Sequence, residues 1–238
     1  MTDSAPRRDI IAIGGGGFLA EPRNYALEKY ILDQTRKDRP KVLMIPTATG
    51  DDAEYVARFH AAFGELGART QHLPFFHRTP ELRSLLLAQD AIFVGGGNTK
   101  SMLAVWREWG LPEILKLAHE SGVVLGGQSA GAICWFEQGV TDSWADRLRP
   151  LDCMGLLSGS CCPHYDGEVD RRPAYHALVQ SRDLKPGYAI EDAVAAHFTH
   201  GRLERVVSKK AGGKAYYVTV EDGAIQERAL AVTLLPAR

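Results

Sequence analysis

One serine lies in the stretch LGGQSAGAICWFEQG, residues 125–139. Around it, residues 127–131 match G-x-S-x-G, the pattern of a nucleophile on a sharp turn between a strand and a helix. An apolar run precedes Ser129 and helix-compatible residues follow it, and small flanking residues suit the little room in such a turn. We therefore predict that Ser129 is the nucleophile of an acyl-transfer reaction. The alternative is that Ser129 only caps a helix, because serine is a favoured N-cap.

A serine nucleophile needs a base at neutral pH. His164 is the best candidate among the eight histidines, because a run of small residues ends just before it and a polar loop begins. A strand end that delivers histidine into a crevice is a common setting for a general base. His197 and His200 form H-x-x-H without cysteine or acidic neighbours, which indicates metal binding only weakly. We expect no metal.

The base in turn needs an acid that orients it. The acidic residues between Ser129 and His164 are Glu137, Asp142, Asp146 and Asp152. Glu137 lies too far along the helix expected after the serine. Asp142 follows the expected end of that helix at Gly139 and is able to fold back. The sequence alone leaves both Asp142 and Asp146 open.

Two glycine-rich turns follow expected strands. Residues 95–97 precede a helix that Asn98 or Thr99 can cap, and their backbone N–H groups are suited to hold an oxyanion at the carboxyl ends of the strands. Residues 14–17 do not complete G-x-G-x-x-G, because Leu19 takes the last glycine position and no acidic residue ends the next strand. We expect no dinucleotide cofactor, and we interpret this turn as a tight crossover against neighbouring backbone.

Short apolar runs alternate with amphipathic segments through the first two thirds of the chain. This alternation predicts a doubly wound, mostly parallel sheet flanked by helices. After about Ala193 the sequence pattern changes to that of short strands, and Asp222-Gly223 is typical of a hairpin turn. This pattern predicts a C-terminal antiparallel addition at the edge of the sheet. We expect one domain over residues 1–238. The expected strands are 9–14, 41–46, 68–74, 91–95 and 122–127, and the expected helices are 22–36, 52–66, 99–109 and 111–120.

The composition is that of an ordinary globular protein, with 45% hydrophobic and 24% charged residues and a formal net charge of -1. This balance gives no reason to expect nucleic acid or a membrane as a partner. No apolar stretch approaches the length of a membrane span. The cysteines offer no CxxC pair, so we expect reduced thiols and a cytoplasmic location. A homodimer remains open. The four cysteines are Cys134, Cys153, Cys161 and Cys162.

The motifs VGGGNT, GGQSAGA and CCPHYD, in this order, resemble the peptidase E family of aspartyl dipeptidases and cyanophycinases, S51. The segments FEQGVTDS, RRPAYH and GYAIEDAVAAHF extend the resemblance over most of residues 10–200. It implies a class I glutamine amidotransferase-like α/β sandwich. A glutamine amidotransferase itself would need cysteine at the position of Ser129, and an α/β-hydrolase would place its histidine near the chain end.

The resemblance also implies the roles of the site residues. Ser129 is the nucleophile, His164 is the base, and Asp142 in VTDS best matches the acid. Gly97 and Ala130 supply the oxyanion donors, and no cofactor is needed.

The substrate implied is a short peptide. The family's dipeptidases cleave after an N-terminal aspartate, which needs a cation for the side chain and a carboxylate for the free amine. Arg171 and Arg172 are candidates for the first role, and Asn98 is a further candidate contact. Exopeptidases with other specificity, including carboxypeptidase or cyanophycinase activity, and a noncatalytic ligand-binding protein are the alternatives. The candidate carboxylates are Asp166, Glu168, Glu191 and Asp192.

Overall fold

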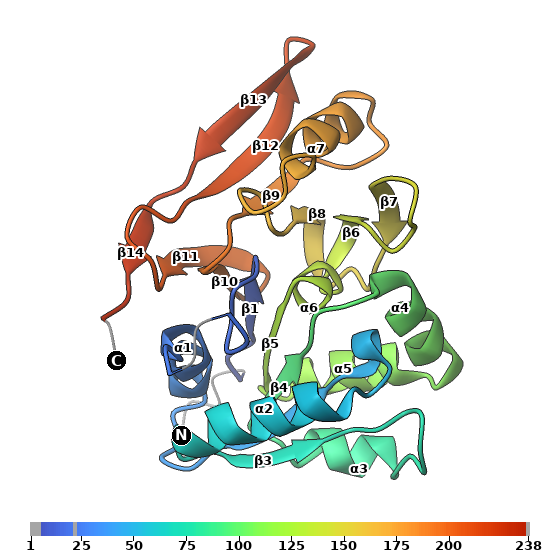
Figure 1. Ribbon diagram of the computed structural model, residues 1–238, viewed down its shortest axis with the longest axis vertical. Helices are drawn as coiled ribbons and strands as arrows, with labels where there is room; N and C mark the ends of the chain where they lie inside the picture. Colours follow the sequence, from blue (N-terminus) through green and yellow to red (C-terminus); the bar gives the residue numbers. More distant parts are fainter. Residues whose placement is uncertain (1–5, 21–22, 237–238) are drawn as a thin grey trace.

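The computed structural model describes residues 6–20 and 23–236 (Figure 1). Its strands form two sheets. The first has the order β14-β11-β10-β1-β5-β4-β2-β3, and the second has the order β13-β12-β9-β8-β6-β7. The strands are β1 (Asp9–Ile13), β2 (Lys41–Ile45), β3 (Arg69–His72), β4 (Ala91–Val94), β5 (Val124–Gln128), β6 (Phe136–Thr141), β7 (Arg149–Asp152), β8 (Leu157–Cys162), β9 (Gly187–Ile190), β10 (Val194–Thr199), β11 (Arg202–Ser208), β12 (Ala215–Glu221), β13 (Ala224–Ala229) and β14 (Val232–Leu234).

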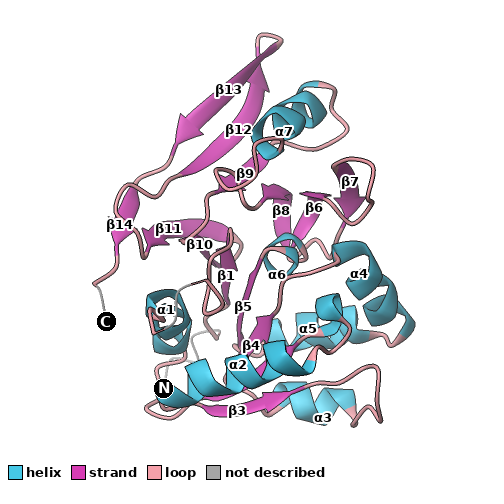
Figure 2. Ribbon diagram, viewed as in Figure 1, coloured by secondary structure: helices cyan, strands magenta, loops and turns pink. Residues whose placement is uncertain are grey.

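Helices cover both faces of the first sheet (Figure 2). On one face, α1 and α2 pack apolar side chains such as Ile31 and Phe59 against Ile11 and Met44. On the other face lie α3, α4 and α5. The helices are α1 (Ala26–Gln34), α2 (Ala53–Glu65), α3 (Leu82–Leu87), α4 (Thr99–Glu108), α5 (Leu111–Glu120), α6 (Ala130–Ile133) and α7 (Arg171–Gln180), with a 3-10 turn η1 (Thr47–Thr49).

The centre of the first sheet confirms the predicted fold class. Strands β3, β2, β4, β5 and β1 are parallel neighbours. β1, β4 and β5 are buried along their whole length, as mostly apolar strands between two helix layers should be. Helix α2 begins where expected, because Asp52 accepts a hydrogen bond from the Tyr55 N–H at 2.7 Å.

The second half of the chain differs from the expectation in two ways. The helix after Ser129 is a single turn, and Phe136–Thr141 is strand β6. The apolar residues of this segment are buried and fit either structure, so their pattern did not reveal the switch. The C-terminal strands also divide. β10, β11 and β14 extend the first sheet, with β10 antiparallel to β1, whereas β12 and β13 join the second sheet beside β9.

Helix α7 covers the second sheet and packs Tyr175 and Val179 against Val140, Cys162 and the β12 strand. All four cysteines are free thiols, and three of them are buried. Within the described part of the chain, no helix is long and apolar enough to cross a membrane.

Four connections meet at the carboxyl ends of the parallel strands. The glycine turn 14–17 follows β1, η1 follows β2, the glycine turn 95–97 follows β4, and Ser129 follows β5. Open α/β sheets bind ligands at this edge. The fold therefore brings together the segments that the sequence singled out for chemistry.

Candidate active site

Ser129 occupies a strained turn between β5 and α6. Its backbone angles are φ 55° and ψ −114°, a region that non-glycine residues rarely adopt. Ser129 stands at the N-cap position of α6, yet its side chain makes no capping hydrogen bond. The capping alternative therefore fails. The strain is instead what a nucleophile elbow requires, because it presents the hydroxyl at the end of the strand.

His164 follows β8 and lies in the same pocket as Ser129. Its Nδ1 is 2.7 Å from Oδ1 of Asp192. A carboxylate only accepts, so Nδ1 carries the hydrogen and donates it, which leaves Nε2 as the basic nitrogen. Both side chains are partly buried, with 23% and 35% exposed. His164 thus has the proton arrangement of a general base oriented by an acid.

Backbone contacts hold Asp192 beside His164. Its N–H donates to Asp166 Oδ1 at 2.8 Å. The residue pairs with Gly15 in an isolated β-bridge, and the next residue, Ala193, donates to the Gly15 carbonyl at 2.8 Å. A Cβ on Gly15 would lie 2.1 Å from Asp192 Oδ1 and 2.4 Å from His164 Cε1. The first glycine turn is therefore a tight crossover, as predicted, and the groups it passes are the His164–Asp192 pair.

This geometry corrects the prediction of Asp142 as the acid. The short α6 leads directly into β6, and Asp142 follows the far end of that strand. Its Oδ2 lies 3.2 Å from Nη2 of Arg171, and its side chain is 61% exposed. The other alternative, Asp146, pairs with Arg149 at 2.6 Å. From the sequence alone, Asp192 was considered only as a candidate to bind the free amine of a substrate.

The glycine turn after β4 lies against the nucleophile. Gly96 approaches Ser129 closely, since a Cβ built on it would be 3.2 Å from the Ser129 Cβ. The Gly96 N–H is already used, because it donates to the Tyr55 hydroxyl at 3.0 Å. Gly97 has φ 133°, packs on Ala48 and lines the pocket. Among the described residues, its N–H donates no hydrogen bond, so it is available to an oxyanion, as is the Ala130 N–H at the first position of α6.

The three predicted substrate contacts lie outside the residues that line this pocket. Asn98 caps α4 by accepting from the Ser101 N–H at 2.8 Å, and its amide donates to the Ser143 carbonyl. Arg171 is 2% exposed and pairs with Glu168 at 2.6 Å. Arg172 pairs with Glu227 and lies over the Tyr165 ring. These side chains hold structural elements together.

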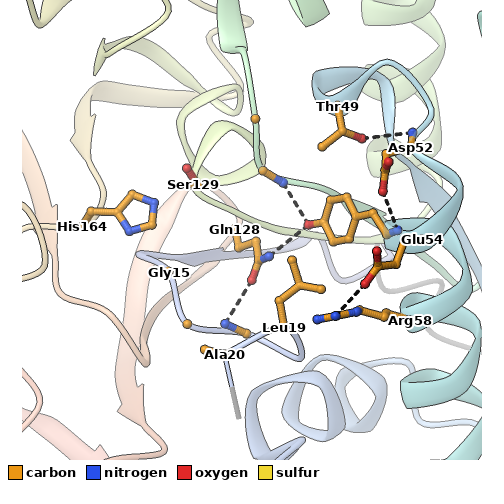
Figure 3. Close-up of a pocket in the computed structure, with 15 residues that line it drawn as sticks. Gly15, Leu19, Ala20, Thr49, Asp52, Glu54, Arg58, Gln128, Ser129 and His164 are labelled. Atoms are coloured by element: carbon orange, nitrogen blue, oxygen red, sulfur yellow. Dashed lines mark hydrogen bonds and ion pairs between the residues drawn. The ribbon is translucent and has the colours of Figure 1, made fainter. Parts of the chain in front are cut away.

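The pocket itself has a volume of about 590 Å³, within the range of small-ligand sites. Figure 3 shows Ser129 and His164 at one end and the Glu54–Arg58 pair at the other, with Gln128 between them. Leu19 and Ala20 form part of its wall. Sequence reasoning missed the contribution of α2, because nothing in its helical periodicity indicates that its first turns line the pocket of Ser129.

Other candidate chemistry falls outside the site. His197 is buried between Asp9 and Tyr30, with ring nitrogens 3.0 Å and 2.8 Å from their oxygens. No cluster of three or more metal-ligating side chains occurs among the described residues. Burial raises the pKa of the Cys134 thiol well above its usual range, so this cysteine stays protonated and packs in the core.

Comparison with known proteins identifies the family of this chain. The model of Peptidase family S51 matches residues 10–206. This chain belongs to peptidase family S51. It is a serine-type peptidase, and its predicted fold and family are confirmed. It is 48% identical to the "Uncharacterized peptidase YgaJ" of Bacillus subtilis (strain 168), with 96% of this chain and 99% of that protein covered.

Similarity also extends to more distant proteins. A "Probable alpha-aspartyl dipeptidase" of Drosophila melanogaster is 28% identical over 79% of each chain. The crystal structure of a peptidase from an acI-B1 Actinobacterium covers 100% of both chains with a TM-score of 0.74 at 17% identity. A putative Peptidase E of Listeria monocytogenes EGD-e covers 87% of this chain and 100% of its own, with a TM-score of 0.62 at 20% identity. These two structures show the shared fold.

Proposed function

We propose that this S51 peptidase hydrolyses short peptides as an exopeptidase, through a triad of Ser129, His164 and Asp192. The observation that carries the proposal is the hydrogen bond from His164 Nδ1 to Asp192, with the strained Ser129 in the same pocket. The names of the relatives, Peptidase E and alpha-aspartyl dipeptidase, support a dipeptidase-like specificity, with N-terminal aspartate as the first preference to test.

The reaction proceeds through an acyl-enzyme. His164 Nε2 takes the Ser129 proton as Oγ attacks the peptide carbonyl carbon, and the carbonyl oxygen becomes an oxyanion held by the N–H groups of Gly97 and Ala130. His164 then protonates the leaving amine as the C–N bond breaks. Water, deprotonated by His164, attacks the ester and releases the acid product and Ser129. Asp192 stabilises the imidazolium in both halves. The protein's own side chains supply every proton transfer.

A short-peptide library with wild type and Ser129→Ala side by side tests this function. We expect wild type to release N-terminal residues or dipeptides, and the variant to lose activity by several orders of magnitude. A fluorophosphonate probe should label wild type only, because it reacts with an activated serine. Equal cleavage by both proteins would contradict Ser129 as the nucleophile, and no cleavage with no labelling of wild type would leave the noncatalytic ligand-binding alternative. The position of the cut distinguishes aminodipeptidase from carboxypeptidase activity.

A further inference from the structure

A chain of hydrogen bonds joins three segments around Ser129. The Gly17 N–H donates to Gln128 Oε1 at 3.1 Å. This bond fixes the orientation of the Gln128 amide, because only its oxygen can accept. The amide nitrogen Nε2 then donates to the Tyr55 hydroxyl at 2.9 Å, and the Gly96 N–H donates to the same hydroxyl at 3.0 Å. The Tyr55 oxygen is therefore an acceptor in both of its bonds.

Neither of these two bonds uses the hydroxyl proton of Tyr55. A phenol that accepts two hydrogen bonds still carries one O–H donor. No acceptor for it occurs among the residues that the structure describes. Tyr55 is 5% exposed and lines the pocket beside Ser129. Burial raises the pKa of Tyr55 to about 12, so the proton stays in place at neutral pH. An acceptor oxygen of a ligand in this pocket would take this hydrogen bond.

The cationic side chain of Arg58 lines the same pocket, about one helical turn after Tyr55. Arg58 lies three residues after Tyr55 on α2, so both side chains are on one face of the helix. Its Nη2 donates to Glu54 at 2.6 Å, and both partners are more than half exposed. Such an exposed pair contributes little stability and exchanges readily. A guanidinium carries five N–H donors, so most remain for a ligand.

The remaining charged groups of the pocket are engaged elsewhere. Asp52 caps α2, and Glu54 is the present partner of Arg58. His164 is held by Asp192 at the catalytic end. Among the described side chains that line the pocket between Ser129 and its other end, the donors that remain for a ligand are thus the Tyr55 hydroxyl and the Arg58 guanidinium. Both groups line one pocket, and a hydroxyl and a guanidinium are the kinds of donor that bind a carboxylate.

The geometry points to Tyr55 and Arg58 as the subsite that binds a carboxylate of the peptide substrate. This inference rests on the proposed peptidase function and identifies its specificity residues. The carboxylate is either the C-terminal group of a very short peptide or an acidic side chain, because both present the same two oxygens. Arg58, and not Arg171 or Arg172, is therefore the cation that binds the negative charge of the substrate.

Four dipeptides separate the two sources. Asp-Leu carries both carboxylates, Asn-Leu and Asp-Leu amide each lack one, and Asn-Leu amide lacks both. We expect wild type to prefer the peptides that retain the recognised carboxylate. Tyr55→Phe and Arg58→Gln should each lower kcat/KM for those peptides by about tenfold to a hundredfold, mainly through KM, and change the others by less than about threefold. Tyr217→Phe and Arg83→Gln, on β12 and α3 outside the pocket, are the matched controls.

The same peptides bound to Ser129→Ala protein give a readout without catalysis. Calorimetry should show that adding Tyr55→Phe or Arg58→Gln weakens binding of the carboxylate peptide and spares its amide. If wild type shows no Ser129-dependent cleavage but this binding difference persists, the proposed function fails and the subsite stands. The subsite is overturned if the variants affect acid and amide peptides equally, if they have no effect, or if none of the four peptides binds.

Discussion

At the scale of single residues, the site depends on backbone strain at Ser129. The angles φ 55° and ψ −114° suit glycine and cost a residue with a Cβ on the order of 1 kcal/mol or more. In the proposed triad the side chain at this position supplies the attacking hydroxyl, which glycine lacks. Stability and reactivity are therefore in conflict at this position.

Two inactive variants make this strain measurable. We predict that Ser129→Gly is more stable than Ser129→Ala by about 1 kcal/mol, a difference of about 2–4 °C in Tm, because glycine removes the strain and alanine retains it. Thermal unfolding by circular dichroism gives the comparison. An alanine variant at least as stable as the glycine variant would show that the turn is not strained.

At the scale of elements, the crossover after β1 lies against His164 and Asp192, the proposed base and acid. Gly15→Ala should abolish most activity while the protein stays folded, because its Cβ would displace the His164–Asp192 pair. The matched control is Gly64→Ala on α2, where nothing lies within 4 Å of the new Cβ. That variant should keep its kcat/KM and gain about 0.5–1 kcal/mol in stability. Full activity of Gly15→Ala would contradict the role of the crossover.

The pairing of β1 with β10 carries a pH-dependent contribution to stability. Burial alone would raise the pKa of Asp9, but hydrogen bonds from His197, Arg7 and Thr199 lower the pKa to about 2. A carboxyl with a lowered folded-state pKa stabilises above its unfolded pKa near 4, and this contribution is lost as pH falls toward 2.

Asp9→Asn should therefore cost roughly 2 kcal/mol at pH 7, and its deficit against wild type should shrink between pH 4 and pH 2. Urea unfolding of both proteins across this pH range measures the difference in their free energies of unfolding. Asp33→Asn, at an exposed position of α1, is the control and should show little pH-dependent difference. A deficit for Asp9→Asn that does not change with pH would contradict the assignment.

The sequence was informative where a residue's neighbours are local. The five parallel strands and helices α2, α4 and α5 follow from apolar runs and periodicity, and Ser129 and His164 follow from strand-end motifs. Asp192 lies 28 residues after His164 and reaches it only through the connection from β9 to β10. The sequence did contain a feature that pointed to Asp192, because this acidic residue stands at a strand end between two apolar runs. The acid was sought only between Ser129 and His164, where the residues left Asp142 and Asp146 open, and the family resemblance then favoured Asp142.

At the scale of the whole molecule, Arg171 ties α7 to the second sheet. The buried guanidinium pairs with Glu168 and Asp142 and donates to the Val140 carbonyl at 3.3 Å. Although burial alone would lower its pKa, the Glu168 carboxylate raises the pKa of Arg171. These contacts engage the positive charge of Arg171, which the sequence analysis had assigned to substrate binding.

Arg171→Met should thus lower the free energy of unfolding by roughly 2 kcal/mol or more, because it leaves buried polar partners unsatisfied. The adjacent Arg172→Met, at a side chain that is 52% exposed, should cost about 1 kcal/mol or less. Both variants should keep kcat/KM within about threefold where they are folded. A raised KM for acidic peptides with unchanged stability would instead return these arginines to the substrate site.

The most direct test of the account compares kcat/KM of Asp192→Asn and Asp142→Asn on the best peptide found for wild type. The triad predicts that Asp192→Asn loses about 10²- to 10⁴-fold, because the amide no longer orients His164 or stabilises its charged form, and that Asp142→Asn stays within about threefold. Circular dichroism should show both folded. A large loss in Asp142→Asn with near-normal activity in Asp192→Asn would contradict the triad of Ser129, His164 and Asp192.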